Sequence, residues 1–173
     1  MQKLKSIGLM VCCLFAGVIT AKLFFTTDNP EIEKAKTTTY TLPSITVFNL
    51  ASEAINLSDD LSLDATNVLI IYALGCNSCI SDAVRWAKIH ESKKDSVNFI
   101  GLAYSSDREA VKTFIQTSAL DFEHRLIDKY NANKIQINDW PIILGVDGNS
   151  NLLFKYEGDT STDSLVSYFS KNN

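Results

Sequence analysis

The feature that most constrains the fold is a continuous apolar run, Asn67 to Leu74 (NVLIIYAL), which leads directly into Cys76-Asn77-Ser78-Cys79. A run without alternation between apolar and polar residues predicts a strand that is covered on both faces, as in the middle of a sheet. From Cys79 to about Ser92, apolar residues recur at helical spacing and predict an amphipathic helix. We therefore expect the two cysteines at the junction between a central strand and the N-terminus of a helix.

The rest of the chain alternates strands with helices. Ile142–Val146 and Leu152–Tyr156 flank a Gly-containing turn and predict an antiparallel hairpin. Further strands are predicted at Ile45–Leu50 and Val97–Tyr104, and further helices after Ser106-Asp107 and at Ser161–Phe169. A short segment at Phe122–Ile127 and a helical turn near Asp128–Lys134 precede Trp140-Pro141. The residues expected to face inward are Ile80, Ala83, Val84, Trp86, Ala87 and His90 on the helix after the cysteines, and Leu165, Val166 and Phe169 on the last helix. The order predicts an α/β fold with a mixed central sheet flanked by helices.

An apolar segment, Ile7 to Phe25, follows two lysines at the N-terminus and is interrupted by one further lysine. Its length and basic flank predict either an uncleaved membrane anchor or a cleaved export signal. Both lead the rest of the chain outward, because the N-terminal lysines stay on the cytoplasmic side by the positive-inside rule. We therefore expect a signal or anchor at residues 1–25, a polar linker at 26–39 and one extracytoplasmic, periplasmic domain at 40–173.

Length and composition fit a single globular domain. About 150 residues follow the apolar segment, enough for one domain with a hydrophobic core. Hydrophobic and charged fractions of 46% and 21% exclude a disordered or fibrous chain. There are 16 basic and 20 acidic residues, and three of the lysines lie in or beside the N-terminal segment. The domain is therefore acidic, without the basic clusters that nucleic-acid binding requires.

Two residues separate Cys76 from Cys79, which allows both sulfurs to meet within one helical turn. At a helix N-terminus, Cys76 also lies near unpaired backbone N–H groups and the positive end of the helix dipole. These groups stabilise a thiolate and lower the pKa of the thiol below its usual value of about 8.5. Cys76 is thus predicted to be the attacking thiol, and Cys79, one turn further along, the thiol that resolves the mixed disulfide.

Two other interpretations of the cysteine pair remain open. A structural disulfide across so short a loop would add little stability. A zinc site needs four ligands, and beyond the apolar segment the chain offers only this pair with His90 and His124 at unpatterned spacing. We expect His90 on a helix flank and His124 at the surface. The favoured interpretation is a redox-active pair that uses no metal and no cofactor.

The chain resembles the membrane-tethered thioredoxin-like proteins of the TlpA and ResA type over roughly Leu42 to Asn172. The matching stretches are Val68–Cys79, Trp140-Pro141-Ile142 and the Asp147-Gly148 turn with the strand that follows it. The resemblance implies a thioredoxin-like fold. It also implies that Pro141 is cis and faces the dithiol, where the backbone of Trp140 pairs with an incoming substrate chain.

The resemblance also singles out Asp82, three positions after the second cysteine, as a residue that assists proton transfer. A carboxylate one helical turn beyond Cys79 is able to accept a proton from the resolving thiol. The competing interpretation is a first-turn carboxylate that the helix dipole favours. The chain departs from the family at Gly75, where a Trp is frequent, and at Asn77-Ser78, where a Pro-containing dipeptide is frequent. These departures leave the reduction potential open.

The leading functional hypothesis is an enzyme that reduces, or else oxidises, disulfides of exported proteins. Its partners would be the disulfides or dithiols of those proteins, with electrons from a membrane-embedded donor. A peroxiredoxin-like peroxidase is an alternative, but residues 72–75 hold neither the Pro nor the Thr that such a site uses. A redox-inert binding module of the same fold is another, although both cysteines are present.

Overall fold

The computed structural model describes residues 40–172 of the chain. The expected membrane segment at 1–25 and the linker at 26–39 lie outside these residues. Among the helices that are described, none is long and apolar enough to cross a membrane.

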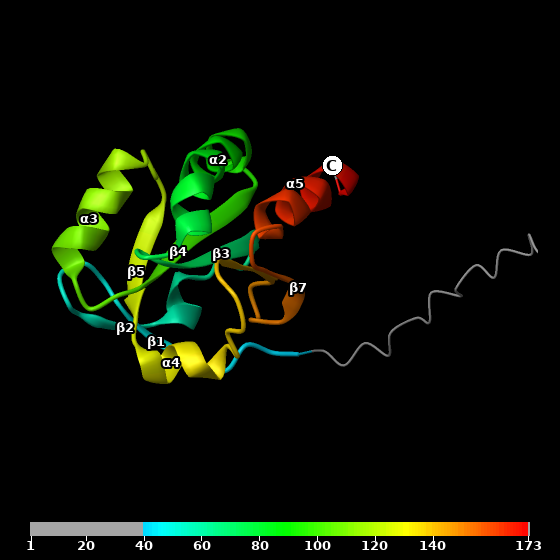
Figure 1. Cartoon of the computed structure of the whole chain (residues 1–173). Coiled ribbons are helices and arrows are strands. Elements are labelled where there is room, and N and C mark those ends of the chain that lie inside the picture. Colours follow the sequence, from blue (N-terminus) through cyan, green and yellow to red (C-terminus); the bar gives the residue numbers. More distant parts are fainter. Residues whose placement is uncertain (1–39, 173) are drawn as a thin grey trace, which may run out of the picture. The chain divides into compact units, whose positions relative to one another are not determined.

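A seven-stranded mixed sheet forms the centre of the domain (Figure 1), in the order β2-β1-β5-β4-β3-β6-β7. Its parallel core consists of β3 (Thr66–Ala73), β4 (Val97–Tyr104) and β5 (Glu123–Ile127). β6 (Ile142–Val146) runs antiparallel to β3, and β7 (Leu152–Glu157) pairs antiparallel with β6. A short hairpin of β1 (Thr46–Phe48) and β2 (Ala54–Asn56) pairs with β5. The predicted mixed sheet and its C-terminal hairpin are confirmed.

Helices cover both faces of this sheet. Figure 1 shows α2 (Asn77–Lys93), α3 (Arg108–Thr117) and α5 (Ser161–Lys171) on one side and the short α4 (Lys129–Lys134) on the other. The 3-10 turn η1 (Leu57–Asp60) packs into the same apolar cluster as α4. Because β3 lies between two layers, Val68 to Tyr72 are fully buried without alternation. Burial on both faces of the sheet explains why this stretch of the sequence is apolar without interruption.

The inward face of α2 differs from the expected one. Its buried residues are Cys79, Asp82, Ala83 and Trp86, while Ile80 is 52% exposed and Val84 is 55% exposed. The buried positions follow helical spacing from Cys79, whose place is fixed by the end of β3. The prediction that Ile80 and Val84 face inward is therefore wrong. The same holds for Val166 on α5, which is 43% exposed, whereas Leu165 and Phe169 are buried as expected.

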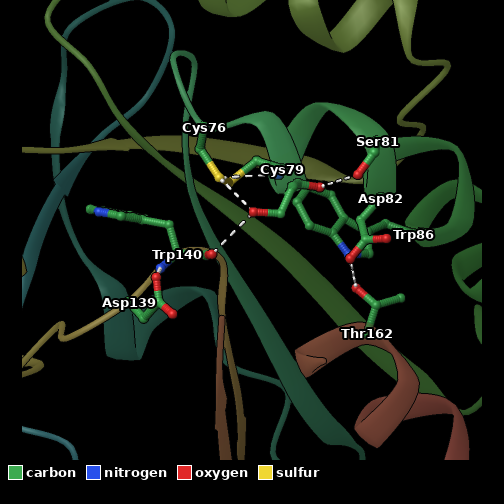
Figure 2. The surroundings of a disulfide bond; sticks show 9 residues. Cys76, Cys79, Ser81, Asp82, Trp86, Asp139, Trp140 and Thr162 are labelled. Carbon is green, nitrogen blue, oxygen red and sulfur yellow. Dashed lines mark hydrogen bonds between the residues drawn. A yellow bond between two sulfur atoms is a disulfide. The ribbon is translucent and has the colours of Figure 1, made fainter. Parts of the chain in front are cut away.

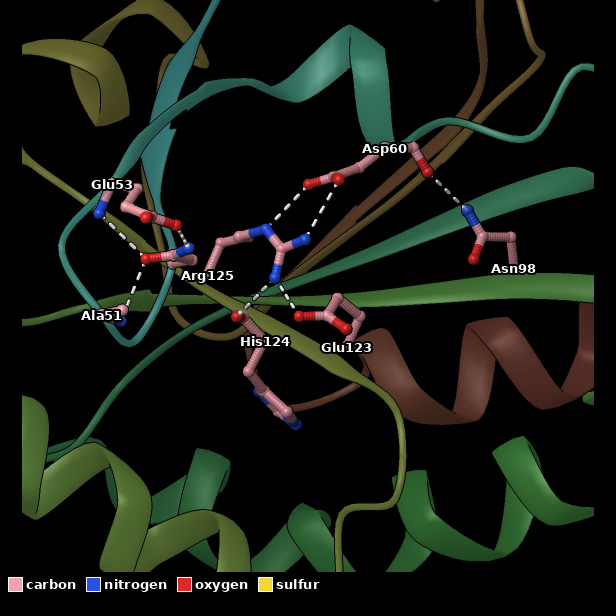
Figure 3. A network of polar contacts seen from close by, with 8 residues as sticks. Ala51, Glu53, Asp60, Asn98, Glu123, His124 and Arg125 are labelled. Atoms are coloured by element: carbon pink, nitrogen blue, oxygen red, sulfur yellow. Dashed lines mark hydrogen bonds and ion pairs between the residues drawn. The ribbon is translucent and has the colours of Figure 1, made fainter.

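A polar network fastens η1 to the sheet (Figure 3). Arg125 on β5 donates to both carboxylate oxygens of Asp60, from Nε at 2.8 Å and from a terminal nitrogen at 3.0 Å, and also pairs with Glu123. Asn98 on β4 donates to the Asp60 carbonyl at 3.0 Å. Such a two-pronged contact fixes the geometry of both partners. The turn that precedes β3 is thereby held against β4 and β5.

Candidate functional site

The two cysteines lie where the central strand passes into α2. β3 ends at Ala73, and the backbone N–H of Cys76 donates to the Ala73 carbonyl at 3.1 Å, which closes a tight turn. Cys76 is the N-cap residue of α2, and Cys79 follows within the first turn. The two are joined in a disulfide with a Cα–Cα distance of 5.2 Å. The predicted placement of the pair at the strand–helix junction is confirmed.

The two sulfurs have different surroundings. Cys76 is half-buried, whereas Cys79 is 0% exposed. The backbone N–H of Cys79 donates to Cys76 Sγ at 3.1 Å, and the hydroxyl of Ser78 lies 3.5 Å from the same sulfur. The Cys79 N–H is suited to stabilise a negative charge on Cys76 Sγ once the disulfide is open. Cys76 is thus the accessible sulfur of the pair and the one that hydrogen bonds favour as a thiolate.

The loop at Trp140-Pro141 meets the dithiol from the other side. The peptide bond between these residues is cis, as expected. Ser78 Oγ donates to the Trp140 carbonyl at 3.4 Å while it also contacts Cys76 Sγ (Figure 2). The Trp140 ring packs on Tyr104 at the end of β4, with ring centroids 5.5 Å apart. The fold therefore brings together two segments that lie far apart in the sequence, and Ser78 connects them.

Asp82 is buried on α2, three positions after Cys79, and is hydrogen-bonded on both oxygens. Thr162 Oγ1 donates to Oδ2 at 2.7 Å (Figure 2). Arg85 donates to Oδ1 at 3.1 Å. The Trp86 indole N–H, which can only donate, lies 2.8 Å from the same Thr162 hydroxyl. Thr162 must therefore accept from Trp86 and give its single proton to Asp82. Arg85 also pairs with the exposed Asp163, so α5 and α2 are linked twice around this carboxylate.

The two histidines lie away from the dithiol. His124, expected at the surface, is only 4% exposed, so that prediction is wrong. It packs at the close approach of β5 to Gly101 on β4, and its Nδ1 contacts the Tyr72 hydroxyl at 3.0 Å. Burial lowers the pKa of His124 to about 4, and the charge of Arg125 adds to this effect. His90 is half-buried on α2, against Phe99 and Phe122.

Sequence reasoning missed Ser78 and Thr162. Ser78 lies inside the motif, and its contact with the Trp140 carbonyl depends on how the loop folds back. Thr162 lies 80 positions from Asp82, so only the docking of α5 brings it there. Within residues 40–172, no three His, Cys, Asp or Glu side chains lie close enough together to hold a metal ion.

Comparison with known proteins finds likeness in structure. No protein-family model matches the sequence, and no curated protein matches it. The structure is similar to the thioredoxin domain of a thiol-disulfide oxidoreductase from Bacteroides vulgatus, with a TM-score of 0.61 and 19% identity over 75% of this chain and 95% of that one. It is also similar to a thiol:disulfide interchange protein from a Bacteroides species, with a TM-score of 0.62 and 19% identity over 75% and 88% of the two chains.

A third similar structure is a secreted disulfide oxidoreductase of Mycobacterium tuberculosis, with a TM-score of 0.59 and 15% identity over 74% of this chain and 96% of that one. At such identities the likeness is one of fold. The expectation of a thioredoxin-like fold with a mixed central sheet is therefore confirmed, and this chain is similar in fold to thiol-disulfide oxidoreductases.

Proposed function

We propose that this protein is a thiol-disulfide oxidoreductase that reduces disulfides of exported proteins through Cys76 and Cys79. The observation that carries the proposal is the unequal pair at the start of α2. Cys76 is half-buried and accepts from the Cys79 N–H, while Cys79 is fully buried in the first turn of the helix. An inert structural disulfide would need neither this asymmetry nor the adjacent Trp140-Pro141 loop. The likeness in fold to oxidoreductases supports the same function.

In the proposed reaction, the Cys76 thiolate attacks one sulfur of a substrate disulfide. A bond forms between Cys76 and that sulfur, and the other substrate sulfur leaves as a thiolate that takes a proton from water. Cys79 then loses its proton to Asp82 and attacks Cys76 Sγ, and the substrate leaves fully reduced. Two electrons pass to the substrate, and the protein is left with the Cys76–Cys79 disulfide.

During the first step, the substrate chain would lie along the loop that precedes β6. Pro141 has no backbone N–H, and the Trp140 carbonyl already accepts from Ser78. The Trp140 N–H donates to the carboxylate of its own neighbour, Asp139, at 2.8 Å. A substrate strand that pairs with Trp140 would therefore exchange with these local contacts. Substrate binding and the position of Ser78 beside Cys76 are coupled in this proposal.

We further propose that the domain acts outside the cytoplasm and receives electrons from a membrane-embedded donor. The apolar segment at residues 1–25 supports export, and one of the similar structures is described as secreted. A thiol reagent that does not cross membranes, added to intact cells, should label the reduced Cys76. Labelling that requires cell lysis would place the domain on the cytoplasmic side.

Exchange is tested with trapping variants of the full chain. Cys79→Ser removes the resolving thiol and should accumulate a covalent adduct with a disulfide-containing protein, which a reductant releases. Cys76→Ser should form no adduct at the same concentration. Equal adduct formation by both variants would contradict the division of roles, and turnover that survives both substitutions would contradict the function.

The direction of transfer is tested by the reduction potential of the couple, measured against a glutathione buffer. A reductase role predicts a value nearer to about −270 mV, as in thioredoxin, than to about −120 mV, as in strong oxidants. A value near the second figure would make the protein an oxidase while leaving the exchange chemistry in place.

A further inference from the structure

A pocket of about 630 Å³ opens at the edge of the sheet where β4 and β5 end, which is also the edge where β3 leads into the cysteine loop. It lies between the loop after β4, the turn after β5 and the β1–β2 hairpin. Phe48, Leu126 and Ile127 supply apolar walls, and Tyr104, Arg108 and Lys129 also line it. No step of the proposed exchange uses these residues. The carboxyl ends of parallel strands are where α/β sheets commonly bind ligands.

The pocket contains two cations without carboxylate partners. Among residues 40–172, neither Arg108 nor Lys129 takes part in an ion pair. The neighbouring carboxylates are directed elsewhere. Asp107 accepts from the N–H of Ala110, and Asp128, which also lines the pocket, accepts from Asn131. The charged side chains that line the pocket are Arg108, Lys129 and Asp128, so the lining carries a net charge of +1 in a domain with an acidic composition.

The pocket lies within reach of a chain bound at the dithiol. Ala73, Tyr104 and Ile127 are register partners in a row across β3, β4 and β5, so the pocket is one to two strand spacings from the start of the cysteine loop. At about 4.8 Å per spacing, the lateral separation is roughly 5 to 10 Å. An extended peptide covers about 3.3 Å per residue, so this distance corresponds to about two to three residues. Tyr104 touches both regions, because its ring packs on Trp140.

We propose that this pocket selects substrates by binding an acidic side chain two to three residues from the cysteine that Cys76 attacks. The inference rests on the proposed exchange function and names the substrate class for it. Arg108 and Lys129 pair with the carboxylate, and the walls formed by Phe48 and Leu126 cover the aliphatic part of its side chain. Neutral and basic peptides lack the paired charge and dock through the Trp140 backbone alone.

The test compares three synthetic peptide disulfides that differ at one position, three residues from the cysteine: Glu, Gln or Lys. The reduced full chain is mixed with each, and kcat/KM is measured at low and high salt. The Glu peptide should react faster than the Gln peptide, and the Lys peptide slowest. Arg108→Gln and Lys129→Gln should each reduce the Glu-to-Gln ratio by about 1.5- to 5-fold, the range for a single partly exposed ion pair. In the wild type, high salt should bring the Glu-to-Gln ratio of kcat/KM closer to one, because salt screens the ion pair.

Lys171→Gln is the matched control, because it removes the same charge at the exposed end of α5. This control should leave the ratio unchanged. Equal rates for the three peptides in the wild type would overturn the pocket assignment while the exchange function stands. If Lys171→Gln lowers the Glu-to-Gln ratio as much as Arg108→Gln does, the pocket assignment is also overturned, because the preference would then depend on the net charge of the protein. Absence of exchange with every peptide would instead refute the proposed function and the inference with it.

Discussion

Cys76 and Cys79 are three positions apart, yet they differ in access and in hydrogen bonding. The N-cap position leaves the sulfur of Cys76 half-buried at the surface and within reach of the Cys79 N–H, whereas the first helical turn carries Cys79 into the core. When the disulfide is reduced, the N–H donor and the helix N-terminus both favour a thiolate at Cys76. Burial in apolar surroundings disfavours a thiolate at Cys79.

This difference predicts selective alkylation. In the reduced protein at mildly acidic pH, a small alkylating reagent should modify Cys76 before Cys79, because only a thiolate reacts and only Cys76 is accessible. Mass spectrometry of peptides after a short reaction measures the order. In denaturant the two cysteines should react at similar rates, which serves as the control. Earlier labelling of Cys79 in the folded protein would reverse the assigned roles.

Asp82→Asn should slow the resolving step, since the carboxylate is the group proposed to take the proton from Cys79. Positioned acid–base groups contribute about 10²- to 10⁴-fold, and we expect a loss toward the lower end. Single-turnover kinetics across pH isolates the step. Asp163→Asn is the matched control, because it also removes a carboxylate partner of Arg85 but leaves Asp82 in place. A pH–rate profile that Asp82→Asn leaves unaltered would reduce Asp82 to a structural charge.

Thr162 is predicted to position Asp82. Thr162→Val keeps the shape but leaves the Trp86 indole N–H and one oxygen of Asp82 without partners in the core. We expect a loss of about 1 to 3 kcal/mol in the free energy of unfolding, the usual range for an unsatisfied buried group. Thr162→Ser retains the hydroxyl and should restore the pH dependence of the resolving step. If valine changes stability but not that pH dependence, Thr162 serves the fold alone.

At the scale of single residues, local spacing gave the sequence analysis its successes. Cys76, Cys79 and Asp82 lie within one stretch, so their placement on the helix followed from periodicity. Thr162 and the burial of His124 depend on contacts between distant segments, which no local pattern contains. Pro141 is an intermediate case, because its cis bond was expected from a resemblance and not from the residues around it.

At the scale of the element, strand and helix positions were predicted well, and helix faces less well. β3 and β4 match the expected runs closely, because continuous burial leaves a continuous apolar pattern. The β2 strand and η1 were not predicted, since both are short, β2 is largely exposed and η1 is mostly polar. Ala83 and Trp86 are buried as expected, but Ile80 and Val84 are apolar yet exposed, so hydrophobicity alone made the predicted inward stripe of α2 too broad.

The close packing between β4 and β5 predicts that one added methyl group, in Gly101→Ala, lowers the free energy of unfolding. A Cβ added at Gly101 would lie 2.3 Å from Nδ1 of His124, so Gly101→Ala forces the imidazole or the strand to move. We expect a loss of about 1 to 3 kcal/mol, typical of overpacking in a core. Gly75→Ala is the control, because a Cβ there meets nothing within 4 Å. Denaturant unfolding of both variants measures the difference, and equal stability would contradict the close packing.

At the scale of the whole molecule, the core contains one polar pair that the proposed chemistry does not use. Tyr72 on β3 and His124 on β5 meet across β4, in the apolar layer beneath α2 and α3. Burial raises the pKa of Tyr72, so its hydroxyl stays protonated. His124 Nε2 is buried and has no hydrogen-bond partner among the described residues. The domain therefore folds around an imidazole for which a positive charge is costly.

This buried imidazole predicts that stability falls in mild acid. The folded pKa of His124 is about 4, against an ordinary value of 6.5, so between these values the unfolded chain binds a proton that the folded chain does not. The stabilisation is fully present above about pH 6.5 and is lost as the pH falls toward 4, by up to about 3 kcal/mol.

Carboxylates also titrate at the acidic end, so the measured quantity is the difference in unfolding free energy between the wild type and His124→Gln, which keeps an acceptor for Tyr72. That difference should shrink steadily from pH 7 to pH 4. If the difference in unfolding free energy between the wild type and His124→Gln is constant with pH, the prediction is contradicted. His124 would then take up a proton as easily in the folded protein as in the unfolded chain.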